Sequence, residues 1–345
     1  MYYLCYLTNI VPTYILGIES SCDDTSASVL CDGKVLSNLV ANQEIHKSYG
    51  GVVPELASRA HQQNIVPVVS QAISLANIDK NQLNAIAYTR GPGLLGSLLV
   101  GSSFSKSLSL GLDVPIIEVN HMQAHLLANF IEDCNEEKPT FPFLGVTISG
   151  GHTQIVLVKD YFEMTVIGET LDDAIGETFD KCGKMMGLPY PAGPIIDKKS
   201  KLGDSDKFKF TKPKVGDLNF SFSGLKTGFL RFIEKESKLN NKFISIELNN
   251  LCASLQNTII EILFDKVTSA IKSTGIKNVV FGGGVSCNSG IIKKFKDEKN
   301  DFKVFFPKFE YTTDNAAMIA MVGYLKFENH LFSNLKKGAK SRYNI

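Results

Sequence analysis

LGIESSCDDTSASVL (Leu16–Leu30) and LGVTISGGHTQIVLV (Leu144–Val158) are the two stretches that decide the fold. They align without gaps, and identical residues stand at positions 16 and 144, 17 and 145, 21 and 149, and 25 and 153. Each stretch has the pattern of an apolar strand, a tight polar turn and a second strand. The identities are few, but the shared order of elements predicts two related lobes.

Further strands and helices follow each hairpin. In the first half we expect a third strand over Lys34–Ala41 and a helix over Pro54–Ala76 that Pro67 kinks or splits. In the second half we expect a helix over 314–327, led or capped by Asp314. This βββαβα layout, used twice, is that of the two-lobed actin-like α/β fold of sugar kinases and chaperone ATPases, which bind nucleotide between the lobes. An α/β protein without nucleotide is the alternative.

The composition is that of an ordinary globular protein, with 44% hydrophobic and 21% charged residues in a chain of 345. At ~150 residues per domain, this length predicts about two domains. We place them at 14–126 and 127–315, with a C-terminal helix at about 316–345 packing back on the first and residues 1–13 as an extension. With a net charge of +1, the protein has no strong overall positive potential that would attract nucleic acid. A polyanion must therefore bind to local clusters of basic residues.

The cysteine spacing and the lengths of the apolar segments indicate the cellular compartment in which the protein is expected. No two of the seven cysteines are spaced as C-x-x-C, which favours reduced thiols over a disulfide framework or a zinc ribbon. No apolar run approaches the ~20 residues of a membrane span. The first twelve residues are apolar but lack the basic start and the cleavage site of a signal peptide. We therefore expect a cytoplasmic protein.

A pair of histidines follows a strand of the first half. Val114–Val119 has strand length, and Asn120 is a good N-cap for the helical pattern after it. His121 and His125 are four residues apart, so they share a helix face just beyond a strand, where open α/β sheets bind ligands. They can hold a divalent metal if a further ligand is supplied, for which Asp314 is the best candidate. The alternatives are an ordinary helix face and a helix cap.

Two glycine-rich turns are candidate nucleotide contacts. Thr147–Gly151 places two glycines between strands, which leaves backbone N–H groups free for an anion or a carbonyl oxygen, and His152 beside them is a candidate catalytic residue. Gly282–Gly284 follows a strand and permits close approach of a flat ligand, and Asn288 is placed to bond a base or a ribose. Turn packing and a hydrogen-bonded histidine are the alternatives.

Carboxylates supply the remaining candidates. Asp180 and Asp197 are candidate ribose ligands, because a carboxylate accepts hydrogen bonds from neighbouring hydroxyls. Glu19, Asp23 and Asp24 cluster in the first turn, where they could order water, magnesium or an amine. A solvated helix face and turn residues without chemistry are the respective alternatives.

Two basic segments are candidate contacts for RNA phosphates. Residues 198–214 hold seven lysines against two aspartates, and the C-terminal end adds Lys336, Lys337, Lys340 and Arg342. A solvated loop and tail would explain both segments equally well.

Together these motifs resemble the TsaD family, the bacterial tRNA N6-adenosine threonylcarbamoyltransferases, once called O-sialoglycoprotein endopeptidases or Gcp. The resemblance covers nearly the whole chain from Tyr14 onward. Its motifs are Ile18–Thr25, Gly91–Leu98, Asn120–His121 with His125, Ser149–Thr153, Phe179–Lys181, Phe220–Lys226, Gly282–Ser286 and Thr313–Asn315.

The resemblance implies the actin-like fold and transfer of threonylcarbamoyl from threonylcarbamoyl-AMP to N6 of the adenosine 3′ of the anticodon, in tRNAs that read codons beginning with A. It implies one iron per subunit, or zinc, on His121, His125 and Asp314. It also implies two partners, a TsaB-like inactive paralogue and a small TsaE-like ATPase. The adenylate contacts that it implies are Thr147, Ile148, Ser149, Gly150, Gly151, Asp180, Gly193, Asp197 and Asn288.

The chain departs from the family pattern at a few positions. Gln123–Ala124 stands where Glu-Gly is more common, and Ala316 and Ser289 stand where Gly and Arg are common. The end reads Ser341–Ile345 where Trp-Pro is frequent. None of these positions is a proposed ligand, so they bear on local geometry more than on activity.

The base that takes the N6 proton is left open, with His152, Glu19, Asp23 and Asp24 as candidates. Three other functions are alternatives to threonylcarbamoyl transfer. A metallopeptidase would need the glutamate of H-E-x-x-H, and residues 122–124 include none. A non-catalytic nucleotide-binding partner is disfavoured by the retained ligand set, and a sugar kinase is a weaker third alternative.

Overall fold

The computed structural model describes residues 12–43, 45–133, 137–297, 299 and 301–345, so most of the predicted extension 1–13 lies outside the described residues. The first half contains β1 (Tyr14–Glu19), β2 (Thr25–Cys31), β3 (Lys34–Ala41), α1 (Ile45–Tyr49), α2 (Pro54–Leu75), β4 (Ala85–Gly91), α3 (Leu95–Leu112), β5 (Ile116–Asn120) and α4 (His121–Leu127). The second contains β6 (Phe143–Ile148), β7 (Thr153–Val158), β8 (Met164–Glu169), α5 (Ile175–Met185), α6 (Gly193–Ser200), α7 (Ser223–Leu239), α8 (Phe243–Thr274), β9 (Asn278–Gly282), α9 (Ser289–Phe295), β10 (Lys303–Phe305) and α10 (Ala316–Glu328).

The two sheets repeat one topology. The strand order is β3-β2-β1-β4-β5 in the first and β8-β7-β6-β9-β10 in the second, and the hairpin strands are antiparallel whereas the later strands are parallel. The register repeats as well, since Leu16 pairs with Val29 in the first hairpin and Leu144 with Leu157 in the second. The predicted duplication and the two-lobed actin-like α/β fold are therefore confirmed.

The central strands are buried on both faces. Every residue of β6 and all but the first of β1 are buried, because helices cover both sides of each sheet. In the first lobe, α2 packs on β2 and α3 on β4 from the outer side. The outermost hairpin strands β3 and β8 are only partly buried. The apolar strands thus fix each sheet as the middle layer of its lobe.

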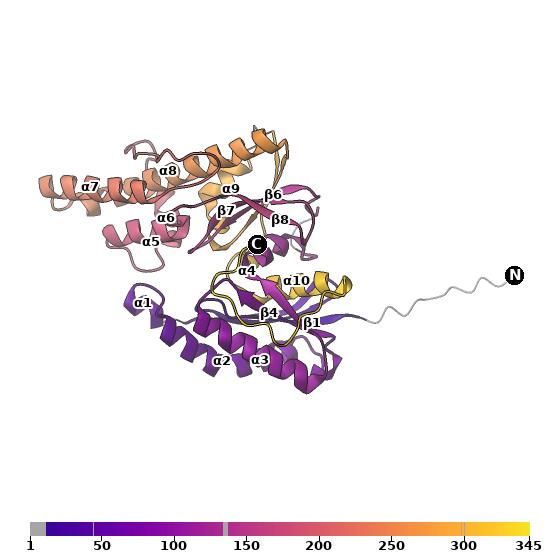
Figure 1. Cartoon of the computed structure of the whole chain (residues 1–345). Coiled ribbons are helices and arrows are strands. Elements are labelled where there is room, and N and C mark those ends of the chain that lie inside the picture. Colours follow the sequence, from indigo (N-terminus) through magenta and orange to yellow (C-terminus); the bar gives the residue numbers. More distant parts are fainter. Residues whose placement is uncertain (1–11, 44, 134–136, 298, 300) are drawn as a thin grey trace.

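Two helices cross from one lobe to the other. α4 follows β5 of the first sheet but packs on β6 and β9 of the second, whereas α10 follows the second sheet and packs on β1, β2 and β4 of the first. Glycine permits each close approach, since a Cβ on Gly17 would lie 2.4 Å from the carbonyl oxygen of Ala316 and one on Gly145 would lie 2.5 Å from an α4 side chain. The two helices contact each other between the sheets (Figure 1). We propose lobes of 14–126 and 127–315, with 316–345 returning to the first because α10 packs there; α4 lies at the boundary and contacts both sheets.

Three local expectations need correction. Pro67 does not split α2, and its exposed position lets water solvate the carbonyl group that loses its partner. α10 begins at Ala316, and the cap is Asn315, whose Oδ1 accepts from the backbone N–H of Met318 at 3.2 Å, rather than Asp314. Residues 198–200, expected in the lysine-rich loop, instead belong to α6 (Gly193–Ser200), which carries a proline in its first turn.

None of the described helices combines the length and the apolar character that a membrane span requires.

Candidate active site

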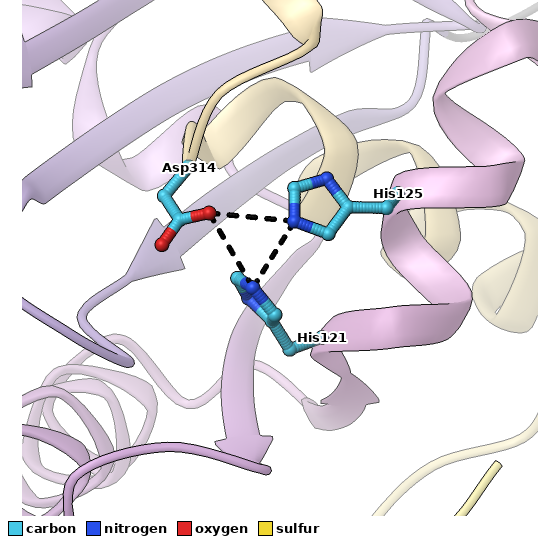
Figure 2. A group of neighbouring side chains, drawn as sticks. All are labelled: His121, His125 and Asp314. Atoms are coloured by element: carbon cyan, nitrogen blue, oxygen red, sulfur yellow. Dashed lines mark hydrogen bonds and ion pairs between the residues drawn. The ribbon is translucent and has the colours of Figure 1, made fainter. Parts of the chain in front are cut away.

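Three predicted metal ligands meet where α4 and the loop before α10 come together (Figure 2). His121 and His125 lie on α4, and the side chain of Asn120 caps that helix by accepting from the N–H groups of Met122 and Gln123. The Nε2 atoms of the two imidazoles are 3.1 Å apart, and Oδ1 of Asp314 lies 3.4 Å from the first and 3.3 Å from the second.

The three distances between these ligand atoms suit a single metal ion that all three residues bind. Ligand atoms about 2.05 Å from a tetrahedral ion lie about 3.3 Å from one another, which is close to the three separations seen here. His125 is fully buried and His121 nearly so, whereas Asp314 keeps 27% of its side-chain surface exposed. The group is therefore open to solvent on the side of Asp314. The ligand role of the three residues stays a prediction that this geometry favours.

Glu19 orients the first histidine. Its Oε2 lies 2.9 Å from Nδ1 of His121 and accepts from Oγ1 of Thr89 at 2.6 Å, and its Oε1 accepts from the backbone N–H of Ser21 at 2.5 Å. Metal-binding histidines commonly carry such a carboxylate on the second ring nitrogen. Nδ1 of His125 has no hydrogen-bond partner within the described chain. Because Glu19 is fully buried, an orienting role suits it better than that of a base.

The buried charges have mutually shifted pKa values. Burial lowers the pKa of His121, but the carboxylates of Glu19 and Asp314 outweigh it and raise that pKa well above the ordinary value. Burial raises the pKa of Asp314, and the facing imidazoles outweigh it and lower that pKa. Burial and the neighbouring His121 lower the pKa of His125. The raised pKa means that His121 binds a proton more tightly than a free histidine does. A metal ion that binds to this imidazole should therefore displace the proton.

An apolar pocket of about 410 Å³ opens beside this group. Five of the predicted adenylate contacts line it, namely Gly150, Asp180, Gly193, Asp197 and Asn288. Three others do not, since Thr147 and Ile148 are buried in β6 and Gly151 faces a different cavity. Ser149 lies next to Gly150 in the turn. The remaining lining residues are Gly176, Phe179, Tyr190, Pro191, Pro194, Gly284, Val285, Cys287, Phe309 and Thr313.

The polar residues of the pocket are already fixed by the protein. Asp180 accepts from the backbone N–H of Ala192 at 2.7 Å, and burial raises its pKa. Asp197 accepts from Oγ of Ser289 at 2.8 Å. The side chain of Asn288 caps α9 and donates to Oε1 of Gln256 at 2.7 Å. Asn288 is therefore largely committed to the fold, and its amide retains one N–H for a ligand.

Two of the predicted base candidates lie within electrostatic reach of the metal-ligand group. Burial raises the pKa of Asp24 to about 7, with further contributions from Asp23, Asp314 and Glu19. Burial, followed by the neighbouring histidines of α4, lowers the pKa of His152, so its imidazole is neutral near pH 7. Both groups can accept a proton near neutrality. The choice between them stays open.

Sequence reasoning missed Asp172 and Asp173, which hold the motif Phe220–Lys226 in place. The Asp172 carboxylate accepts from Oγ of Ser221 at 2.6 Å, from Oγ of Ser223 at 2.7 Å and from the N–H groups at the start of α7. The Asp173 carboxylate pairs with Lys181 and Lys226, each at 2.7 Å. The signal was a pair of adjacent carboxylates, but their partners lie about 50 residues away.

Replacing Asp172 by asparagine should make the stability of the protein less dependent on acid. Partial burial raises the pKa of Asp172, but the hydrogen bonds from Ser221, Phe222 and Ser223 outweigh it and lower the pKa to about 2, against 3.8 ordinarily. A depressed carboxyl pKa stabilises the folded state above the ordinary value, and that stabilisation is lost as the pH falls towards 2. Denaturant titrations should therefore show a wild-type advantage at pH 5 to 7 that shrinks below pH 4. An advantage that is constant with pH would contradict the assignment.

The fold and the site define a class first: a two-lobed, actin-like α/β protein with a histidine–carboxylate group where the lobes meet. Solved structures agree on the fold. Full-length HypF in its phosphate- and nucleotide-bound form superposes with a TM-score of 0.62 at 14% identity, over 93% of this chain and 47% of that one. Component A of the Acidaminococcus fermentans (R)-2-hydroxyglutaryl-CoA dehydratase gives 0.52 at 13% identity, over 91% and 98%.

The chain belongs to the TsaD family, described as tRNA N6-adenosine threonylcarbamoyltransferase, whose model matches residues 34–321. A relative of that name from Christiangramia forsetii is 63% identical over 96% of this chain and 98% of its own length. Another from Riemerella anatipestifer is 59% identical over the same shares. The chain is therefore an acyltransferase that modifies tRNA, as the resemblance implied.

Proposed function

We propose that this chain transfers threonylcarbamoyl from threonylcarbamoyl-AMP to N6 of the adenosine 3′ of the anticodon, in tRNAs that read codons beginning with A. The single observation that carries the proposal is the convergence of His121, His125 and Asp314 on one point beside an apolar pocket. A reactive acyl group held at that point lies beside the pocket that we assign to the nucleotide.

The adenylate is assigned to the pocket that Gly150, Asp180 and Asn288 line. Asp180 and Asp197 accept from ribose hydroxyls. Of the Thr147–Gly151 turn, Gly150 lines this pocket, and its N–H group is assigned to the phosphate or the carbonyl oxygen, whereas the N–H of Ser149 donates to the carbonyl of His152 at 2.9 Å. Gly150 supports this placement because a Cβ there would meet no protein atom within 4 Å and its φ is ordinary. Neither the backbone nor the packing requires glycine there, so close approach of a ligand is the remaining reason.

The metal that we assign to the histidine–carboxylate group is iron(II), with zinc as the alternative. Two histidines and one carboxylate with open positions suit non-haem iron, and the same donors also hold zinc. When bound, the ion supplies Lewis-acid polarisation and orientation of the acyl group. Glu19 keeps Nε2 of His121 turned towards the shared point through its bond to Nδ1.

The residues of the chain itself move the proton and hold the leaving group. The adenine N6 nitrogen forms a bond to the carbamoyl carbon, the bond from that carbon to the adenylate phosphate oxygen breaks, and AMP leaves with the electron pair. His152 or Asp24 takes the proton that N6 loses. The backbone N–H of Gly150, which lines the pocket, stabilises the charge that develops on the oxygen. The anticodon loop offers the base unpaired, which the reaction requires.

The proposed partners are a TsaB-like paralogue and a TsaE-like ATPase, working in the cytoplasm. This part of the proposal rests on the family resemblance.

Transfer to matched tRNA transcripts tests the proposal. The metal-loaded chain, with both partners and the adenylate, should modify a transcript that has adenosine 3′ of the anticodon and leave unmodified one that has guanosine there. Digestion and mass spectrometry of the nucleosides detect the product. Equal modification of both transcripts, or no product under conditions in which a family member is active, would count against it.

A further inference from the structure

A second cavity, of about 780 Å³, lies on the other side of the glycine turn. Gly150 faces the pocket assigned to the adenylate, whereas the next residue, Gly151, lines the second cavity together with His152. The turn is therefore a partition with one cavity on each side. The other lining residues are Thr153, Gln154, Glu169, Thr170, Leu171, Asp172 and Arg342.

Arg342 reaches this cavity on the C-terminal strap, residues 330–345, which ends between the lobes close to α4 (Figure 1). The strap is tied first to the edge of β5. The backbone N–H of Ser333 donates to the carbonyl of Ile116 at 2.8 Å, and the N–H of Glu118 donates to Oγ of Ser333 at 2.7 Å. The buried Glu118 carboxylate then pairs with Lys337 at 2.7 Å. A segment bonded in this way has a fixed course.

The residues on both sides of Arg342 are also fixed. The backbone N–H of Gly93 donates to the carbonyl of Ser341 at 3.2 Å, and Nδ2 of Asn120 donates to the carbonyl of Tyr343 at 3.1 Å. Gly91 lies so close to the strap that a Cβ there would overlap the carbonyl oxygen of Lys340. The backbone thus holds Arg342 in place while its side chain is exposed.

The guanidinium group of Arg342 makes no ion pair with any described residue, although two carboxylates line the same cavity. Asp172 is fully engaged at the start of α7, as described above. Glu169 accepts from Nε2 of Gln154 at 3.3 Å. Leu171, 62% exposed, adds an apolar surface beside them. Beside these two carboxylates the cavity offers one arginine that forms no ion pair with a described residue and one exposed apolar side chain, so a phosphate that enters it has Arg342 as its cationic partner.

We propose that Arg342 binds a backbone phosphate of the tRNA anticodon loop and positions the loop in this second cavity. The inference rests on the proposed placement of the adenylate across the turn, which leaves this side for the second substrate. A guanidinium fork binds phosphate through two parallel N–H donors, and the contact carries no base information of its own. Arg342 is thus a positioning residue for the RNA.

The test compares R342Q and R342K with R231Q in the complex with both partners. Arg231 is an exposed arginine of α7 that also makes no ion pair with a described residue. R342Q should raise the KM for tRNA about tenfold, the effect of losing one charge-assisted hydrogen bond, and should lower the slope of log binding against log salt by about one. The KM for the adenylate should not change. R342K should keep the salt slope, and R231Q should behave as wild type.

Equilibrium binding of tRNA without adenylate, by fluorescence anisotropy, separates this inference from the proposed chemistry, because it needs no transfer. An unchanged tRNA affinity and salt slope in R342Q would overturn the inference, as would a changed KM for the adenylate alone. If R342Q also lowers the melting temperature, the tRNA affinity of R342K distinguishes a lost phosphate contact from a loss of folding. Recovery of tRNA binding by the lysine supports a phosphate contact, and failure to recover it refutes one.

Discussion

A double variant in which His121 and His125 become alanine should lose its bound metal and about 10³-fold in the rate of transfer to tRNA. The magnitude follows from the several kcal/mol that a metal ion contributes by stabilising charge in the transition state. Both Nε2 atoms face Oδ1 of Asp314 within 3.4 Å, so removing them leaves a single carboxylate. One carboxylate cannot hold the ion at this position.

Metal content by mass spectrometry and single-turnover transfer measure this outcome. His330→Ala is the matched control, because His330 is exposed just beyond α10 and is not among the proposed ligands. Thermal melting of the variants monitors the fold, since both replaced imidazoles are buried. A folded double variant that transfers threonylcarbamoyl at the wild-type rate would refute the metal assignment. One that binds metal normally but is inactive would refute the ligand assignment alone.

Gly150→Ala should lower kcat/KM about 10²-fold without changing the melting temperature. A Cβ at Gly150 meets no protein atom within 4 Å, so the folded chain accommodates it. The methyl group would instead point into space that the adenylate is proposed to fill, and a shift of the reacting atoms by ~1 Å costs about 10²-fold. Steady-state kinetics with varied adenylate, together with thermal melting, measure the two effects separately.

Two further glycines control this result. Gly216→Ala likewise adds a Cβ with no atom within 4 Å, but outside the pocket, so activity should stay at the wild-type level. Gly176→Ala would place a Cβ 2.7 Å from the carbonyl oxygen of Ser149, so it should reduce both activity and stability. Gly150→Ala with wild-type kinetics would show that no ligand approaches the turn closely.

Much of the fold was predictable because its signals are local. The repeated hairpin pattern at Leu16–Leu30 and Leu144–Val158 predicted the duplication, and the strand register follows the alignment residue by residue. Asn120 was recognised as an N-cap from its type and position alone, and it does accept from the second and third helical N–H groups. Each of these features depends on neighbours within a few positions.

What could not be predicted depends on contacts between distant segments. Asp314 was expected to lead or cap α10, but Asn315 caps it, and the aspartate faces His121 and His125, which lie 193 and 189 positions earlier in the chain. Spacing within α4 indicated that the two imidazoles share a face, and Asp314 was the best candidate for the third ligand, but only the packing of α4 against α10 shows the three side chains together. The strap that carries Arg342 was read as a basic tail, because its anchors on Glu118 and Asn120 lie more than 200 residues away.

The packing of α4 against α10 has a consequence for the proposed metal site. These helices follow different sheets and contact each other between them. A cation held by His121, His125 and Asp314 would therefore cross-link two segments that are far apart in the chain. Because such an ion binds the folded arrangement and not the unfolded chain, adding it should raise the melting temperature of the protein by an amount that increases with its affinity.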